Sequence, residues 1–201
     1  DWRDTALVDA AGTCDWIVIT NNPKSLVMEF RRDPTNQLWR IVRPLQARAD
    51  SSRLDTAIQQ LRDGRATQFA ADDPRADLTG YGLKPADLDV WLGSGTNSAT
   101  AVHVGKALPT NNPAQVYAQR EGWNTVLAAT SDTFAPWRGQ VNDYRDTHLL
   151  SPLPPVSEIE VHGEENFALR QTASNTWAVA GEKFPADRDR IQQFRKLLAG
   201  L

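Results

Sequence analysis

The chain has 201 residues, 40% of them hydrophobic and 23% charged, which is ordinary globular usage and excludes disordered, coiled-coil and collagen-like proteins. Its 22 Lys and Arg against 25 Asp and Glu leave a net charge of −3 without a basic face or tail, so nucleic acid is not an expected partner. The longest apolar runs fall well short of the roughly 18 residues that a membrane span needs.

Three short apolar runs open the chain, at residues 17–19, 26–31 and 38–42. Apolar and polar residues alternate within the second and third runs, which is the period of a half-buried strand. The runs are separated by Asn21-Asn22-Pro23 and Asp33-Pro34-Thr35-Asn36, whose residue types favour turns. We therefore expect a three-stranded meander.

A helix is predicted directly after this meander. Asp50 and the two serines that follow it offer side-chain oxygens for a helix N-cap. Gly64 supplies a plausible end. The apolar residues at i, i+3, i+4 and i+7 that would form the buried face are Leu54, Ala57, Ile58 and Leu61.

The middle of the chain is again rich in strand signals. Four strands are predicted at 90–92, 100–104, 115–118 and 125–129, joined by connections rich in Gly, Asn and Pro. The segment Pro152-Leu153-Pro154-Pro155 lacks a backbone donor at three of its four positions, so it cannot continue a strand. We expect a stiff linker there.

The order of the first segment returns at the C-terminal end. Strands are predicted at 159–161, 167–169 and 177–179, and Pro185-Ala186-Asp187 opens a further helix. Trp177 takes the position of Trp39. The apolar residues on one face of this second helix are Ile191, Phe194, Leu198 and Leu201.

These patterns predict an α+β fold that is β-rich and mostly antiparallel. A duplicated βββα unit, over residues 14–65 and 156–201, flanks a central β meander over residues 66–151. The three segments form one compact domain or two closely packed domains.

Motifs for catalysis, cofactors and metals are missing from the sequence. Cys14 is the single cysteine, so neither an internal disulfide nor a cysteine-based metal site can form. His103, His148 and His162 lack zinc-site spacing. Neither a phosphate loop nor a nucleophile elbow is present. We predict no catalytic residue, no cofactor, no metal ligand and no enzymatic activity.

One cluster keeps an enzymatic alternative open. Asp143, Arg145, Asp146 and His148 could in principle supply acid–base groups. The structural interpretation is that Arg145 and Asp146 tie a loop to neighbouring backbone through charge-assisted hydrogen bonds. We favour the structural interpretation.

Aromatic residues in loops favour a binding function. Trp123 follows Gly122 in a predicted turn and Trp137 follows Pro136 in another loop, so we expect both to be exposed. Loop aromatics of this kind sometimes mark contacts with sugars, peptides or proteins. The candidate binding residues are Trp123, Trp137, Tyr144, Arg145 and Asp146.

Five ordered motifs resemble the bacterial family catalogued as domain of unknown function 4340. They are Trp39-Arg40-Ile41-Val42-Arg43-Pro44, Ala47-Arg48-Ala49-Asp50, Tyr81-Gly82-Leu83-Lys84-Pro85, Val116-Tyr117-Ala118 and Tyr144-Arg145-Asp146. The resemblance implies an extracytoplasmic (periplasmic) body tethered by an N-terminal membrane helix and grouped with ABC-type transport or gliding-motility components. It implies no catalytic residue. This chain lacks the helix, and we expect that the anchor was removed.

We therefore expect a non-enzymatic extracytoplasmic scaffold or binding domain that is accessory to an ABC-type membrane transport complex, with proteins of that complex as partners. One alternative is a hydrolase-like enzyme with a site around Asp143–His148. Another is a small-ligand carrier with a pocket between the repeats.

Overall fold

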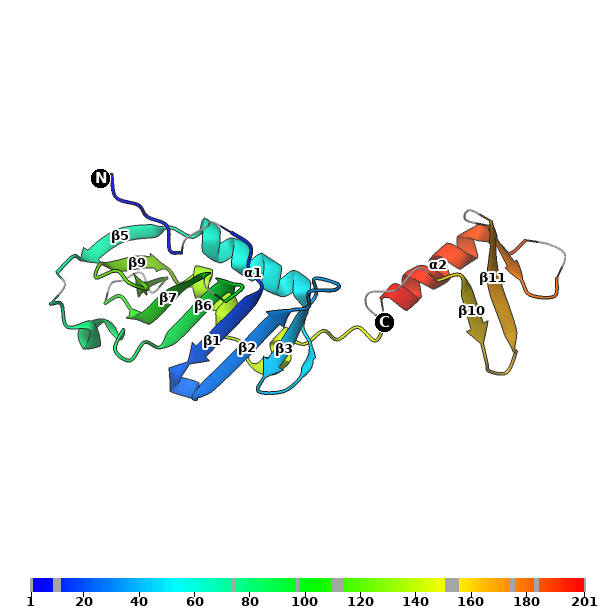
Figure 1. Cartoon of the computed structure of the whole chain (residues 1–201), viewed down its shortest axis with the longest axis horizontal. Helices are drawn as coiled ribbons and strands as arrows, with labels where there is room; N and C mark the ends of the chain where they lie inside the picture. Colours follow the sequence, from blue (N-terminus) through cyan, green and yellow to red (C-terminus); the bar gives the residue numbers. More distant parts are fainter. Residues whose placement is uncertain are drawn as a thin grey trace. The chain divides into compact units, whose positions relative to one another are not determined.

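The computed structural model describes residues 2–8, 12–73, 75–96, 98–109, 114–150, 156–173, 176–182 and 185–200. The chain divides into two compact units, Asp1–Asp146 and Thr147–Leu201 (Figure 1). Each unit contains an antiparallel sheet and an α-helix, so the predicted α+β, mostly antiparallel class is confirmed. The predicted linker at 152–155 lies outside the described residues.

The first unit contains a nine-stranded sheet in the order β4-β3-β2-β1-β6-β7-β8-β9-β5, with antiparallel pairing throughout. The three predicted N-terminal strands and the four predicted central strands are confirmed, whereas β4 and β5 were not predicted. The strands are β1 (Trp16–Asn21), β2 (Leu26–Arg32), β3 (Trp39–Arg43), β4 (Ala47–Arg48), β5 (Ala66–Ala71), β6 (Leu88–Ser94), β7 (Ser98–Ala107), β8 (Gln115–Arg120) and β9 (Val126–Thr130).

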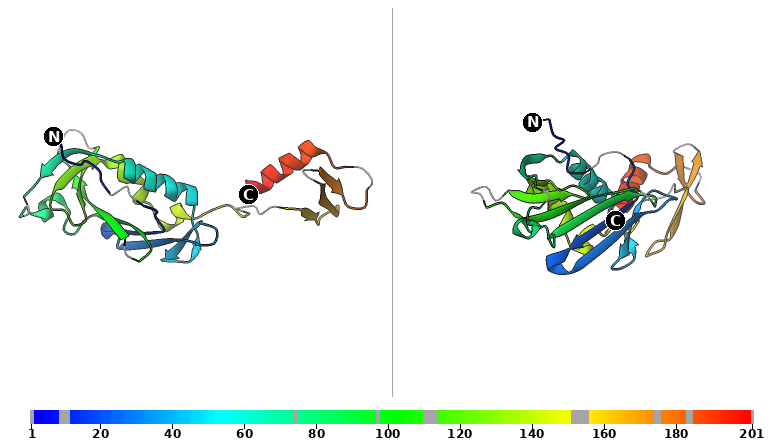
Figure 2. Two further views of the ribbon diagram at one scale, coloured as in Figure 1. Left: turned by 45° about the horizontal axis from the view of Figure 1, so that its top comes forward. Right: turned by 60° about the vertical axis from the view of Figure 1, so that its left-hand side comes forward.

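Helix α1 (Ser51–Asp63) covers one face of this sheet (Figures 1 and 2). The Asp50 carboxylate accepts a hydrogen bond from the Arg53 backbone N–H at 3.0 Å, which is the predicted N-cap. The helix ends where the Gly64 N–H donates to the Leu61 carbonyl. All four predicted apolar positions of the helix are buried.

The core of the first unit lies between α1 and the sheet. Alternate residues of the strands point into it, as the two-residue period requires. Short 3₁₀-helices η3 (Ser131–Trp137) and η4 (Val141–Tyr144) close one side of it and contribute further buried rings. The largest fully buried side chains are Trp39, Trp137, Tyr144, Phe30 and Phe134.

The Tyr-Gly-Leu-x-Pro motif forms a turn. Its tyrosine ends a 3₁₀-helix, η2 (Leu78–Tyr81), and Gly82 follows with φ at 68°. A Cβ at Gly82 would come within 2.8 Å of the Lys106 backbone nitrogen on β7. Glycine is therefore required twice over at this position, for its positive φ and for close approach to a strand.

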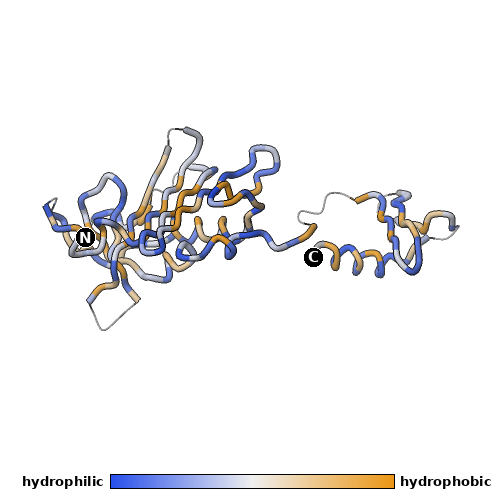
Figure 3. Tube along the Cα trace, turned by 90° about the horizontal axis from the view of Figure 1, so that it is seen from below, coloured by the Kyte–Doolittle hydropathy of each residue, from blue (hydrophilic) through white to orange (hydrophobic). Residues whose placement is uncertain are grey.

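The second unit is a three-stranded sheet with one helix. Its strands, β10 (Glu158–Val161), β11 (Phe167–Ala173) and β12 (Thr176–Val179), pair in sequence order. Helix α2 (Arg188–Ala199) alternates hydrophobic and hydrophilic residues (Figure 3). The strands and helix predicted here are confirmed, although Leu201 lies outside the described residues. The buried core consists of Leu169, Trp177 and Ile191.

Neither α-helix meets the requirements of a membrane span, and the same holds for every other helix in the part of the chain that the structure describes.

Candidate functional site

The expected exposure of Trp137 is wrong. Trp137 is fully buried, whereas Trp123 is exposed over 56% of its surface. The reason lies in η3, where side chains three residues apart lie on the same face of a 3₁₀-helix. Phe134 and Trp137 are three residues apart, and both rings point into the core.

Tyr144 is also buried, and its hydroxyl donates a hydrogen bond to the Pro136 carbonyl at 2.6 Å. Its ring makes an edge contact with Phe30, with centroids 5.3 Å apart. Burial raises the pKa of the Tyr144 hydroxyl to about 12. The phenol therefore holds η3 against the core, and it is not a donor for acid–base chemistry near neutral pH.

The polar residues around Tyr144 support the backbone. The Asp143 carboxylate accepts a hydrogen bond from the Gln140 N–H at 2.7 Å, which caps η4. Arg145 pairs with Ala49 in an isolated β-bridge. The Asp146 N–H donates to the Arg48 carbonyl, and the two side chains form an ion pair at 3.6 Å. These contacts tie the loop to β4 and to the start of α1, but through backbone hydrogen bonds and an ion pair between side chains rather than through the expected charge-assisted bonds from Arg145 and Asp146 to backbone.

His148 falls in the second unit, after the boundary at Asp146. Its side chain is exposed. The predicted acid–base cluster is thus divided between two units.

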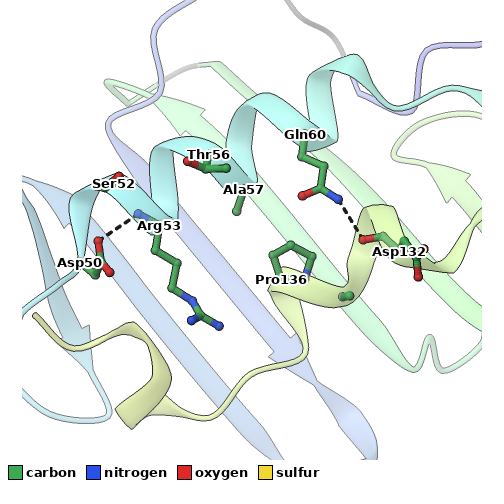
Figure 4. A pocket seen from close by; sticks show the side chains of 9 residues that line it. Asp50, Ser52, Arg53, Thr56, Ala57, Gln60, Asp132 and Pro136 are labelled. Atoms are coloured by element: carbon green, nitrogen blue, oxygen red, sulfur yellow. Dashed lines mark hydrogen bonds between the residues drawn. The ribbon is translucent and has the colours of Figure 1, made fainter.

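A groove of about 600 Å³ lies beside α1 and is our candidate functional site (Figure 4). Polar side chains of α1 form one wall, and η3 forms the other. The lining residues are Asp50, Ser52, Arg53, Thr56, Ala57, Gln60, Asp132, Ala135 and Pro136. We call this the α1 groove.

Arg53 is the one cation among the residues that line the α1 groove. Its side chain extends from the helix toward η3, and its guanidinium lies 5.3 Å from the centre of the Tyr144 ring. The Gln60 side-chain amide bridges the two walls by donating to the Asp132 carbonyl at 3.0 Å (Figure 4). The carboxylate of Asp50 is held by its capping bond.

This arrangement suits recognition by hydrogen bonds. The Arg53 guanidinium can bind carbonyl, hydroxyl or carboxylate oxygens of a partner, and the hydroxyls of Ser52 and Thr56 elsewhere in the lining add further hydrogen-bonding groups. The groove lacks a nucleophile paired with a base among its lining residues.

Arg53, Thr56 and Gln60 were not predicted as site residues. Their signal was their spacing, because residues 53, 56 and 60 recur on the polar face of a predicted helix. Such spacing also describes any solvated helix face, so it does not by itself mark a site.

Trp123 occupies the turn between β8 and β9. The Arg120 guanidinium lies 4.3 Å from the centre of its ring, and the Gln119 side chain donates to its carbonyl at 2.8 Å. A cation over the ring and a fixed backbone hold this exposed indole in place. It remains a candidate contact residue.

A second groove, of about 740 Å³, is lined by three arginines together with Cys14 and Asp15. Arg32 donates to Asp55 at 2.5 Å and to the carbonyls of Cys14 and Gln37. Arg31 pairs with Glu29 at 2.9 Å. The charges of Arg31 and Arg32 are neutralised within the protein, whereas Arg62 donates to the Gly12 carbonyl at 2.8 Å and its buried Nε has no hydrogen-bond partner among the described residues. Burial raises the pKa of the Cys14 thiol, so this cysteine is a poor nucleophile.

His103 lies on the sheet face away from α1 and bridges two carboxylates. Its Nδ1 is 2.6 Å from Asp89 and its Nε2 is 2.7 Å from Glu121. The hydrogen bond with Asp89, assisted by that with Glu121, raises the pKa of His103. Both ring nitrogens of His103 are therefore occupied. From β7, His103 bridges Asp89 on β6 and Glu121 in the turn after β8.

Metal binding finds no support in the arrangement of charged side chains. Throughout the described ranges, groups of three or more His, Cys, Asp or Glu that could hold a metal ion are absent.

Comparison with known families gives one match. The sequence profile of "Domain of unknown function (DUF4340)" matches residues 39–201, from β3 to the end of the chain. Neither the curated proteins nor the solved structures contain a match to this chain.

Proposed function

The chain belongs to the family of domain of unknown function 4340, and on that premise we propose that it is a non-enzymatic scaffold or binding domain. It works outside the cytoplasm, tethered to the membrane in the full-length protein, as an accessory of an ABC-type transport complex. The location and the partner class follow from what the family resemblance implies.

The observation that carries the binding function is the chemistry of the α1 groove. Arg53 projects into a groove lined by hydroxyl, amide and carboxylate groups, in which the Asp50 carboxylate is held by its capping bond and no nucleophile is paired with a base among the lining residues. The neighbouring groups that could act in catalysis hold the fold instead, since Tyr144 bonds Pro136 and Asp143 caps η4. This division of roles supports recognition of a partner over chemistry on a substrate.

We also propose that the two βββα segments are copies of one unit. Strand registers support this, because Ile17, Phe30 and Ile41 lie side by side across β1, β2 and β3. The matching residues of the second unit are Ile159, Leu169 and Val179, which lie side by side across β10, β11 and β12.

Equivalent hydrogen bonds lead into the two helices. The Ala49 N–H donates to the Trp39 carbonyl at 3.0 Å, and the Ala186 N–H donates to the Trp177 carbonyl at 2.7 Å. In each copy the next residue is an aspartate that caps the helix. Shared register and shared entry to the helix support a duplication more strongly than sequence spacing alone.

The binding function is tested by affinity capture of the full-length, membrane-anchored protein from its own host, with mass spectrometry of the captured proteins. We expect transport-complex subunits to be recovered. Arg53→Ala should lower their recovery about tenfold, the effect of losing one charge-assisted hydrogen bond.

Gln59→Ala is the matched control, because Gln59 is exposed on the same helix but does not line the α1 groove. It should leave recovery unchanged. Repeated failure to recover any transport subunit would contradict the proposed function. Equal recovery with both variants would remove the α1 groove from it.

A further inference from the structure

We infer that the open edge of β10 is a strand-binding surface, and that it takes an extended segment of a partner protein in which apolar and basic residues alternate. The inference deepens the proposed binding function and rests on it and on the proposed duplication. It assigns the surface to the second unit and gives the partner segment a chemistry.

The second unit has one covered edge and one open edge. The covered edge is that of β12. Ala178 forms a β-bridge with Pro185, and the Ala186 N–H donates a hydrogen bond to the Trp177 carbonyl. β10 pairs with β11 on one side. Among the described residues, nothing pairs with its other side.

The backbone groups along that open side can be identified. The Gln171 N–H donates to the Ser157 carbonyl, so residue 157 faces β11. Along an antiparallel strand, the backbone N–H and C=O groups of successive residues point alternately toward and away from the neighbouring strand. Those of Glu158 and Glu160 therefore point away from β11. These two residues offer a partner strand two donors and two acceptors.

The first unit has a strand at the corresponding place. β1 corresponds to β10, and its second side is paired with β6, with Ile17 opposite Leu92 and Ile19 opposite Val90. β6 buries Leu88, Val90 and Leu92 at alternate positions. The corresponding edge of β10 can therefore accommodate an antiparallel strand that, like β6, carries apolar residues at alternate positions.

Apolar surface beside β10 remains uncovered. Phe167, which lies opposite Val161 on the neighbouring strand, is 41% exposed, whereas its counterpart Met28 is fully buried. Leu198 of α2 is half-buried, whereas its counterpart Leu61 is fully buried. A partner strand with apolar residues at alternate positions would extend the sheet face on which these side chains lie.

The charge of the β10 edge determines which residues the partner strand carries between its apolar positions. Glu158 and Glu160 are exposed on β10, and Glu164 and Glu165 follow in the turn after it. Arg170 donates to Glu158 at 2.6 Å and His162 lies 3.5 Å from Glu160, so one cation and one histidine face four carboxylates and the edge remains acidic. A second copy pairing antiparallel through β10 would place glutamates opposite glutamates, which is destabilising. Lys or Arg at those positions of a partner strand would instead pair with them.

The test is titration of the full chain with the peptide Lys-Val-Lys-Ile-Lys-Val-Lys, followed by amide NMR. We expect saturable shifts centred on the amides of Glu158 and Glu160. Glu160→Pro removes a donor that faces away from β11, so the sheet tolerates it, and it should weaken binding about tenfold. Glu160→Thr keeps the donor and should bind within about threefold of the wild-type affinity.

The indole signal of Trp177 reports whether each variant keeps the fold of the second unit. If Glu160→Pro does not fold, Glu158→Lys with Glu160→Lys serves instead. That double variant should lose affinity for the basic peptide and gain affinity for Glu-Val-Glu-Ile-Glu-Val-Glu.

Several results would overturn the inference. These are absence of binding at millimolar peptide, equal binding by a folded Glu160→Pro variant, or a dimer in sedimentation that Glu160→Pro makes monomeric. Peptide binding without capture of transport subunits would contradict the proposed function alone. Capture of those subunits without peptide binding would contradict the strand-binding edge alone.

Discussion

The two segments that we propose to be copies share their strand register and differ in what surrounds them. In the first, β1 is paired on both sides and Leu54, Ile58 and Leu61 are buried. In the second, β10 is paired on one side, and among the described side chains of α2 only Ile191 is buried. The local sequence pattern therefore determines the strands and helix of each segment. How completely their apolar side chains are buried depends on the further strands that pair beside them.

Size explains the contrast. A small unit buries a smaller fraction of its chain than a large one, so its core is correspondingly thin. The second unit spans residues 147–201, and among its described residues the buried apolar side chains are Leu169, Trp177 and Ile191. Matched substitutions in the two segments measure this difference.

The largest expected effect is that of the paired tryptophans. Trp39 is buried, donates its indole N–H to Asp55 at 2.8 Å and contacts the Arg32 guanidinium at 4.5 Å. Trp39→Ala should lower the unfolding free energy of the first unit by about 3–5 kcal/mol. Trp177→Ala should cost about 3 kcal/mol and unfold the second unit.

Urea denaturation followed by amide NMR resolves the two units. Trp123→Ala is the control, because its exposed ring should contribute less than about 1 kcal/mol. A loss from Trp123→Ala as large as that from Trp39→Ala would contradict the assignment of core and surface.

Leucines at equivalent helix positions give the next largest effect. Leu61→Ala should cost about 3 kcal/mol, and Leu198→Ala about 1 kcal/mol, because only the first is fully enclosed. Differential scanning calorimetry of each variant measures both losses. Equal losses would mean that Leu198 is covered in solution, which would sharpen the search for the segment that covers it.

Helix caps should behave alike if the two segments are copies of one unit. Asp50 accepts one backbone N–H and Asp187 accepts two. Replacement of either by Ala should cost about 1 kcal/mol, and replacement by Asn should restore most of it. Chemical denaturation of the four variants provides the check. A cap whose removal costs nothing would break the proposed equivalence of the helices.

The smallest expected effect depends on pH and is confined to the first unit. The raised pKa of His103 stabilises the fold fully below about pH 6.5, the ordinary histidine value, and the gain is lost as pH rises through the folded pKa. Stability should fall over that range in the wild type and stay flat in His103→Gln.

His162 serves as the control, since it is exposed and 3.5 Å from Glu160. His162→Gln should keep the slope of the wild type. If the stability of His103→Gln still falls with pH over this range, the pH dependence belongs to another titratable group.

Periodicity was sufficient to predict β1–β3, the four central strands, β10–β12 and both α-helices, because each carries a local apolar pattern bounded by turn formers or caps. It missed β5, whose sequence Ala-Thr-Gln-Phe-Ala-Ala has little apolar alternation and is a strand because β9 pairs with it. It placed Trp137 at the surface because a loop tryptophan has no local signal of direction. The α1 groove depends on η3 lying beside α1, a contact between distant segments.

The position of the single cysteine has a practical consequence. Cys14 is 8% exposed and lies two residues before β1, and the second unit carries no cysteine. A thiol reagent can therefore modify the native chain only when this end of the large sheet opens. The rate of labelling at Cys14 reports the local opening of one unit in the presence of the other, without an introduced probe.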